Sequence, residues 1–398
     1  MTVALTSAAE KIEARPVSSG RNLACDRTRT FLILLVLLHH AVIPYTYYGH
    51  TDIQSLLAFD GIVVFNDSYF MAAMFLLSGL FVWPSLNRKG ISHFLRDRLL
   101  RLGLPFAVCA IFLMPVAYYA IELREHGSSF GAFWWKTVTT GPWPSGPAWF
   151  VGVLLVFDVA AAIVYRVMPG CIEALGRLSC ASLMRPAYAF WALFAASVVA
   201  YIPIDLYFGP GRWFTFGPFA IQASRILLYL LYFFAGVGIG STKFELGLLS
   251  RDGGLARQWL VWLAASVLSY SCIVVLLYVK HNDVADMNHL PLWWRLAHTT
   301  AFVCFSAAQT FSLLALFLRF DSKGTSLLDP LRESAFGIYL IHYVPVLWLQ
   351  YALFGASLAP AEQETAVLKA LIAFVLTLAI SWAATAALRK IPGATRVL

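Results

Sequence analysis

The feature that most constrains this fold is a series of ten long apolar stretches, which span residues 31–49, 68–86, 102–121, 148–165, 187–204, 226–242, 258–279, 296–318, 334–356 and 370–388. A helix that crosses a bilayer needs about 20 predominantly apolar residues, and its backbone hydrogen bonds must be satisfied internally. The first stretch runs for 19 residues without Asp, Glu, Lys or Arg. It is long enough to stay in the membrane as an anchor. We therefore expect an all-α polytopic integral membrane protein with about ten transmembrane helices.

Composition excludes most other classes of protein. Hydrophobic residues make up 60% of the chain and charged residues only 13%, whereas soluble domains are roughly a quarter charged. The net charge of +8 is not accompanied by a stretch that mixes basic and aromatic residues outside the apolar segments, so we expect no nucleic-acid partner. None of the six cysteines forms a CxxC pair. No metal site or disulfide framework is therefore expected.

The basic residues predict the orientation in the membrane. If the N-terminus is cytoplasmic, the inner segments hold 22 of the 29 Lys and Arg residues and the outer segments hold 7. Cytoplasmic loops are enriched in Lys and Arg. We therefore expect both termini in the cytoplasm, with a tail over 1–28, a membrane domain over 29–390 and a tail over 391–398. The expected location is a bacterial-type inner (plasma) membrane.

The first apolar stretch carries an arginine and a histidine that are eleven residues apart. On a helix this spacing is about three full turns, so Arg29 and His40 share a face and lie about 16 Å apart along the axis. Asp26 lies near the same face, while His39 points about 100° away from His40. Ionisable groups at such depth usually face a bundle interior or a wet cavity. A histidine that only bonds a neighbouring helix is the alternative.

Three further polar side chains interrupt apolar stretches. Ser78, His342 and His40 each lie at nearly the same distance from the cytoplasmic end of their stretch. This agreement predicts a single intramembrane site. Ser78 could instead serve helix packing together with Gly79, because small residues allow helices to approach closely. Asp158 lies near the middle of the fourth stretch, where it would orient a histidine or satisfy a partner helix.

Charged and aromatic residues distinguish the two sides of the membrane. The inner loop after the second stretch gathers five cations, among them Arg96, Arg98 and Arg101. Such a cluster fits an orientation signal in contact with anionic lipid, or a site for a phosphate-rich molecule. The outer loop before the fourth stretch is rich in Trp, Gly and Pro and includes Trp143 and Trp149. These tryptophans fit interfacial anchors or a surface on which sugar rings stack.

Five short motifs occur in order along the chain: Asp26-x-x-Arg29 followed by His40, then Phe75-Leu76-Leu77-Ser78-Gly79, Arg98-x-x-Arg101 before Pro105, Ala148-Trp149-Phe150, and Tyr339-Leu340-Ile341-His342. In this order and spacing the chain resembles the acyltransferase-3 family of membrane O-acyltransferases over about 26–390. Thr30 departs from the family pattern, in which a glycine often follows the arginine.

The resemblance implies a ten-helix fold that moves an acyl group from a cytoplasmic donor, usually an acyl-coenzyme A, to hydroxyls of glycans or other acceptors. It implies that Arg29 and His40 are essential and that Arg96, Arg98 and Arg101 bind coenzyme A. Free-standing members of this length resemble proteins that succinylate periplasmic glucans or acetylate exopolysaccharides. The expected partners are therefore the bilayer and a periplasmic glycan acceptor, with acyl-CoA as donor and no permanently bound cofactor.

The residue chemistry agrees with these implications. Acyl transfer to an alcohol needs a base, and we assign this role to His40. Arg29 would stabilise the donor or fix His40, and Ser78 or His342 would stabilise the oxyanion. The acceptor would approach past the outer loops that hold Trp143 and Trp149, with Asp158 as a further substrate-binding residue. The rivals are a proton-coupled secondary transporter of a small solute and a membrane sensor that reports pH. The sequence shows no repeat between its halves, which disfavours the transporter.

Overall fold

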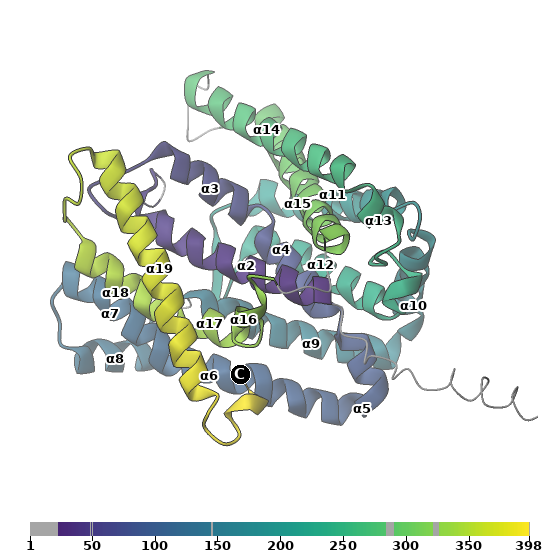
Figure 1. Cartoon of the computed structure of the whole chain (residues 1–398), viewed down its shortest axis with the longest axis horizontal. Helices are drawn as coiled ribbons and strands as arrows, with labels where there is room; N and C mark the ends of the chain where they lie inside the picture. Colours follow the sequence, from purple (N-terminus) through teal and green to yellow (C-terminus); the bar gives the residue numbers. More distant parts are fainter. Residues whose placement is uncertain are drawn as a thin grey trace, which may run out of the picture.

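Helices make up most of the part of the chain described by the computed structural model, which covers residues 23–47, 49, 51–144, 146–283, 290–320 and 326–397. The first 22 residues of the expected tail and the outer-loop residue Asp286 lie outside these ranges, as does Lys323. The bundle is shown in Figure 1. Its helices are α2 (Leu23–Val42), α3 (Leu57–Asp67), α4 (Phe70–Gly79), α5 (Val82–Arg98), α6 (Leu104–Val108), α7 (Met114–Glu125), α8 (Phe130–Thr139), α9 (Trp149–Val167), α10 (Pro169–Ala181), α11 (Ala187–Phe208), α12 (Ile226–Gly240), α13 (Gly254–Arg257), α14 (Trp259–Asp283), α15 (Leu292–Phe320), α16 (Asp329–Arg332), α17 (Ala335–Ile341), α18 (Tyr343–Leu353) and α19 (Glu362–Leu388).

Shorter turns connect these helices. Two π-helical segments, η2 (Leu99–Gly103) and η3 (Cys109–Leu113), join α5, α6 and α7 into one long helical run. Strands β1 (Trp213–Phe216) and β2 (Phe219–Gln222) form an antiparallel hairpin in which Trp213 pairs with Gln222. The 3-10 turns are η1 (Ile43–Tyr45), η4 (Gly146–Ala148), η5 (Ala223–Arg225), η6 (Phe244–Leu246) and η7 (Ala394–Arg396).

The expected all-α membrane architecture is confirmed. Within the described ranges, nine helical segments are long and apolar enough to cross a membrane, and a tenth is the pair α17 and α18, bent by 46°. The nine run over Leu23–Tyr45, Leu57–Gly79, Val82–Glu125, Gly146–Val167, Ala187–Phe208, Ala223–Gly240, Trp259–Asn282, Leu292–Phe320 and Glu362–Leu388. The bend falls at His342, so a polar residue lies where this span, the ninth in sequence order, is broken.

Several span boundaries differ from the sequence expectation. The first helix begins at Leu23, ahead of the apolar stretch, because Arg27 is buried and bonds Asp329 of α16. The expected inner loop around Arg96 is largely helical, since α5 continues to Arg98. An apolar stretch marks only the residues that face lipid. The helix itself extends beyond that stretch wherever its polar side chains find bonding partners.

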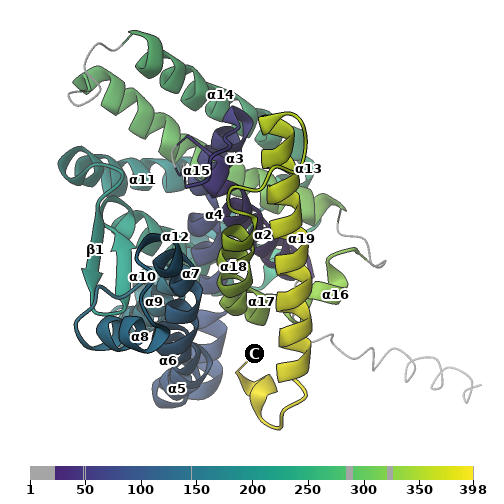
Figure 2. The ribbon, with the colours of Figure 1, turned by 90° about the vertical axis from the view of Figure 1, so that its left-hand side faces the viewer.

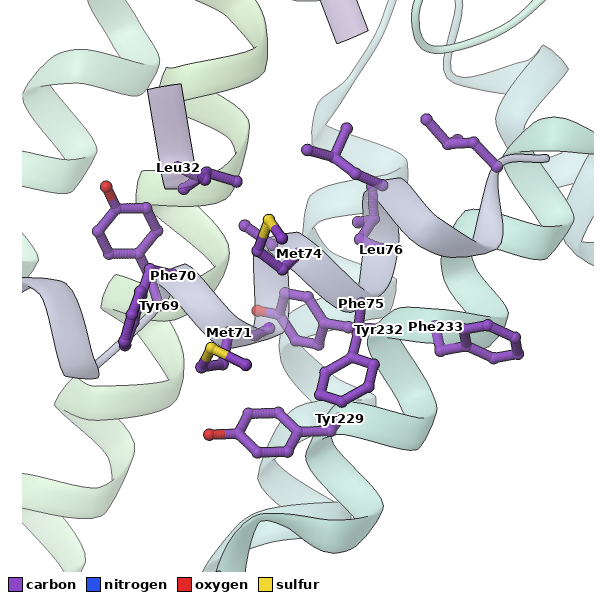
Figure 3. Close-up of a cluster of buried hydrophobic side chains, with 14 of the residues drawn as sticks. Leu32, Tyr69, Phe70, Met71, Met74, Phe75, Leu76, Tyr229, Tyr232 and Phe233 are labelled. Atoms are coloured by element: carbon purple, nitrogen blue, oxygen red, sulfur yellow. The ribbon is translucent and has the colours of Figure 1, made fainter. Parts of the chain in front are cut away.

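Glycines allow α4 and α12 to pack backbone against backbone. A Cβ placed on Gly79 would lie 2.1 Å from the carbonyl oxygen of Phe233, and one on Gly236 would lie 2.0 Å from that of Leu76. Aromatic side chains fill the space beside this contact, including Phe75 and Tyr229, whose rings lie 5.1 Å apart (Figure 3). Gly79 therefore serves the close packing of these two helices, since small residues bring membrane helices together.

Helix α2 lies at the centre of the molecule. It contacts α3, α4, α15, α16, α17, α18 and α19, and the views in Figures 1 and 2 show it enclosed by these helices. Thr28 and Thr30 bond back to the carbonyls of Ala24 and Asp26, which satisfies their hydroxyls within the helix. The fold therefore positions Arg29 and His40 inside the bundle rather than against lipid.

Candidate active site

Two histidines from distant parts of the chain meet inside the bundle. Nε2 of His342, at the bend between α17 and α18, lies 3.2 Å from Nδ1 of His40 on α2. The side chain of His342 is fully buried. Its Nδ1 lies 2.7 Å from the backbone carbonyl oxygen of Tyr339. The histidine pair is therefore tied to the backbone of α17.

These contacts define which nitrogens carry protons when both rings are neutral. The carbonyl of Tyr339 can only accept, so Nδ1 of His342 carries a hydrogen and donates it. Nε2 of His342 then holds a lone pair and accepts from Nδ1 of His40. The remaining nitrogen, Nε2 of His40, is left with a lone pair. This is the form of imidazole that removes a proton from a hydroxyl group.

Neighbouring segments fix this pair in place. Gln350 of α18 donates to the backbone carbonyl of His40 at 2.7 Å, and the ring of Tyr343 meets that of His40 edge-on at 5.0 Å. The turn at Gly146 and Pro147 packs on the same bend. The hydroxyl of Tyr339 donates to the carbonyl of Pro147 at 2.5 Å. The site thus joins α2, α17, α18 and the segment that precedes α9.

His39 lies in different surroundings. Its ring packs against Phe70 of α4 at 5.3 Å, and its Nδ1 is buried without a hydrogen-bond partner among the described residues. The nearby charged groups belong to a separate pair, in which Arg225 bonds Asp67 at 2.5 Å. The separation of the two adjacent histidines therefore agrees with the helical-wheel argument.

A cavity of about 340 Å³ opens beside α2 and carries cationic side chains. Its lining includes Arg29 of α2, Arg98 of α5 and Arg101 of η2, together with apolar residues from α4, α9 and α17. Along α2 the cavity extends from Arg29 to Ile33, which is the direction of His40. On α17 it includes Tyr339, the residue whose carbonyl binds His342. The arginines therefore line one part of a cavity whose apolar part approaches the histidine pair.

Carboxylates and backbone groups hold two of these arginines. Nε of Arg98 lies 3.2 Å from the carboxylate of Asp158, which is fully buried. Arg29 donates to the carbonyl of Leu77 at 3.3 Å and lies 3.8 Å from Asp26. Asp158 therefore positions an arginine at the cavity rather than a histidine. This places it away from the outer loops where the sequence argument expected the acceptor.

Ser78 does not share the depth of the histidines. It lines the cavity beside Arg29, since Arg29 bonds the preceding residue, Leu77. Helix α4 runs antiparallel to α2, and its Phe70 end meets His39. Ser78 therefore lies about two turns of helix, roughly 12 Å, from the histidine level. Its hydroxyl donates to the carbonyl of Met74. The depth expected for Ser78 was wrong because the second span ends at Gly79, seven residues before the expected cytoplasmic end at residue 86.

Other expected site residues lie elsewhere. Arg96 is exposed and does not line the cavity. Trp149 begins α9 and stacks on Tyr229 of α12 at 5.8 Å, so packing engages its ring. Trp143 is half-buried in the segment between α8 and α9. Sequence reasoning missed Tyr339, Tyr343 and Gln350, although the first two belong to or adjoin the motif that ends at His342.

Within the described ranges, no group of three or more His, Cys, Asp and Glu side chains could hold a metal ion.

Comparison with protein families identifies the chain. The model of the acyltransferase domain that defines acyltransferase-3 matches residues 22–386, nearly the whole sequence. The chain belongs to the acyltransferase-3 family. No curated protein and no solved structure matches it. As an acyltransferase-3 protein with nine or ten candidate spans in the described part of the chain, it is a multi-pass membrane acyltransferase.

Proposed function

We propose that the protein is an O-acyltransferase that moves an acetyl or succinyl group from a cytoplasmic acyl-CoA onto a carbohydrate hydroxyl, on a periplasmic glucan or an exopolysaccharide. The observation that carries this proposal is the contact between His40 and His342 near the apolar part of a cavity that Arg29, Arg98 and Arg101 also line. Acyl transfer needs both parts, a base for the acceptor and cations for the phosphates of the donor.

The proposed reaction assigns each step to a group in the site. Nε2 of His40 removes the proton from the acceptor hydroxyl while the hydroxyl oxygen attacks the thioester carbonyl carbon. The carbon–sulfur bond then breaks, and the coenzyme A thiolate takes the proton from His40. His342 holds His40 in the reactive tautomer through the 3.2 Å contact. The arginines bind the donor phosphates and keep the thioester directed along the cavity.

The acceptor would approach from the side opposite the arginines. A small pocket there is lined by Pro44, which follows α2, and by Gln350, which bonds the carbonyl of His40. Arg124 and Asp52 also line this pocket and supply polar groups of the kind that bind sugar hydroxyls. The proposed arrangement therefore keeps donor and acceptor on opposite sides of the histidine pair.

Mass spectrometry of cell-envelope glycans tests the proposal. Glycans from the parent strain should carry an acyl mass that is missing in a deletion strain and restored by the intact gene. The mass of the missing group distinguishes acetyl from succinyl, and the fragment that carries it identifies the acceptor. Identical glycan masses in parent and deletion strains would contradict a carbohydrate acceptor.

A further inference from the structure

A segment far from the arginine motif in sequence reaches the same cavity. After α19 the chain reverses at Gly393, whose φ of 87° lies in the left-handed region that glycine adopts without strain. The short turn η7 (Ala394–Arg396) follows. Thr395, Arg396 and Val397 then line the cavity together with Arg98 and Arg101. Figures 1 and 2 show this yellow segment folding back toward α17 and the α5–α6 region.

The fold fixes the origin of this segment. Arg389, which follows α19, donates to the backbone carbonyl of Glu333 beside α16 and lies 3.4 Å from its carboxylate. Helices α17 and α19 also pack closely, because a Cβ on Gly337 would lie 2.3 Å from Thr385. The end of α19 is thus held against the helices that carry Tyr339 and His342. The position of Arg396 at the cavity follows from this attachment.

Among the described residues, two arginines of the cavity form no ion pair, although Asp97 lies near enough to Arg101 for their charges to interact. Asp26 lies near Arg29, and Asp158 pairs with Arg98. In the part of the chain that the structure describes, neither Arg101 nor Arg396 has a carboxylate within ion-pair distance. Two such guanidinium groups on one cavity favour a ligand with several negative charges, and guanidinium forks match phosphate oxygens.

We propose that the segment Gly393–Val397 is a wall of the donor site and that Arg396 binds phosphate groups of the nucleotide part of the acyl donor. This inference rests on the proposed function, since it assumes a coenzyme A thioester as donor. Arg396 acts alongside Arg98 and Arg101 but comes from the other end of the chain. The segment thereby encloses the nucleotide on the side that the transmembrane helices leave open.

Binding of coenzyme A to the purified full chain in detergent, measured by calorimetry at low salt, tests the inference. Arg396→Ala should weaken binding about tenfold, and Arg396→Glu should weaken it further because it repels phosphate. Arg396→Lys should retain part of the affinity. Lys390→Ala is the matched control, since Lys390 is a cation that also follows α19 but does not line the cavity. It should change affinity less than twofold.

Thermal unfolding of each variant checks that it is folded, which is expected because Arg396 is exposed. Wild-type affinity in both the Ala and the Glu variants would overturn the role of Arg396 while leaving the proposed donor intact. An equal loss of coenzyme A affinity in Lys390→Ala would show that the effect comes from general surface charge, and it would overturn the role of Arg396 as well. Failure of the wild-type protein to bind coenzyme A would instead overturn the proposed donor, and this inference with it.

Discussion

Arg96, Arg98 and Arg101 carry the same charge within one short segment, yet only Arg98 and Arg101 line the cavity. Replacing either of these by alanine should raise the KM for the acyl donor about tenfold to hundredfold, because a lost charge-assisted hydrogen bond is worth about 1.5–3 kcal/mol. The KM for the acceptor should change little. Steady-state kinetics with purified enzyme measures both constants.

Arg96→Ala is the control for this prediction, since Arg96 is exposed and lies outside the cavity. It should keep a donor KM close to that of the wild type. If all three variants show the same donor KM as the wild type at normal expression, the cluster serves membrane orientation and lipid contact rather than donor binding.

The sequence predicted some residue positions well and others poorly. The eleven-residue spacing placed Arg29 and His40 on one face because helical periodicity is a local property of the chain. The depth of Ser78 and the partner of Asp158 depend on how α4 and α9 pack, which no local pattern specifies. The contact of His40 with His342 joins residues 302 positions apart. The sequence predicted only that these two histidines lie at a similar depth in the membrane.

At the scale of elements, an ion pair attaches α16 to α2. Arg27 is buried and donates to both carboxylate oxygens of Asp329, at 3.0 and 2.8 Å. Hydrogen bonds from Arg27 lower the pKa of Asp329 to about 2. Because the folded-state pKa lies below the unfolded value of about 3.9, the pair stabilises the fold fully above that value. The contribution is lost as the pH falls toward 2.

Asp329→Asn should therefore lower the thermal unfolding midpoint at pH 7, and the difference from the wild type should narrow as the pH falls from 4 to 3. Thermal unfolding in detergent across this range measures the effect. A difference that stays constant down to pH 3 would show that the carboxylate charge is not what stabilises the contact.

The backbone contact between α4 and α12 gives a second prediction for elements. Gly236→Ala would place a Cβ 2.0 Å from the carbonyl of Leu76, and such overpacking costs about 1–3 kcal/mol. Gly131→Ala in α8 is the control, because its Cβ would meet nothing within 4 Å. Unfolding in denaturant should show a lower free energy of unfolding for Gly236→Ala and no loss of that free energy for Gly131→Ala. Equal stability of both would contradict the close approach.

For the whole molecule, the orientation in the membrane is a prediction from the 22 and 7 basic residues on the two sides. Reporter fusions should place Ser92 and Lys323 in the cytoplasm, and Gly141 and Asp286 outside. A fusion at Lys323 that reports the outer side would contradict both the orientation and a cytoplasmic donor site.

The helical membrane fold was predictable because apolar length is a strong signal. Most of the ten stretches gave the spans to within several residues, but the second and third spans begin 11 and 20 residues earlier than expected. The β1–β2 hairpin was not predicted, since four-residue strands between spans carry little pattern. The bend at His342 was also missed, because one apolar stretch covers both halves of the broken span. The return of the segment after α19 to the cavity depends on the contacts of Arg389 and on the turn at Gly393, which only tertiary structure reveals.

The central claim is that His40 is the base for acyl transfer, and a comparison of two adjacent histidines tests it most directly. Acylation of envelope glycans would be measured by mass spectrometry in a deletion strain complemented with His40→Ala or His39→Ala at matched membrane levels. A general base contributes roughly 100-fold to 10,000-fold in rate, so His40→Ala should abolish detectable acylation. His39→Ala should retain substantial activity, because His39 packs on Phe70 away from His342. Full activity in the His40 variant, or loss only in the His39 variant, would contradict the account.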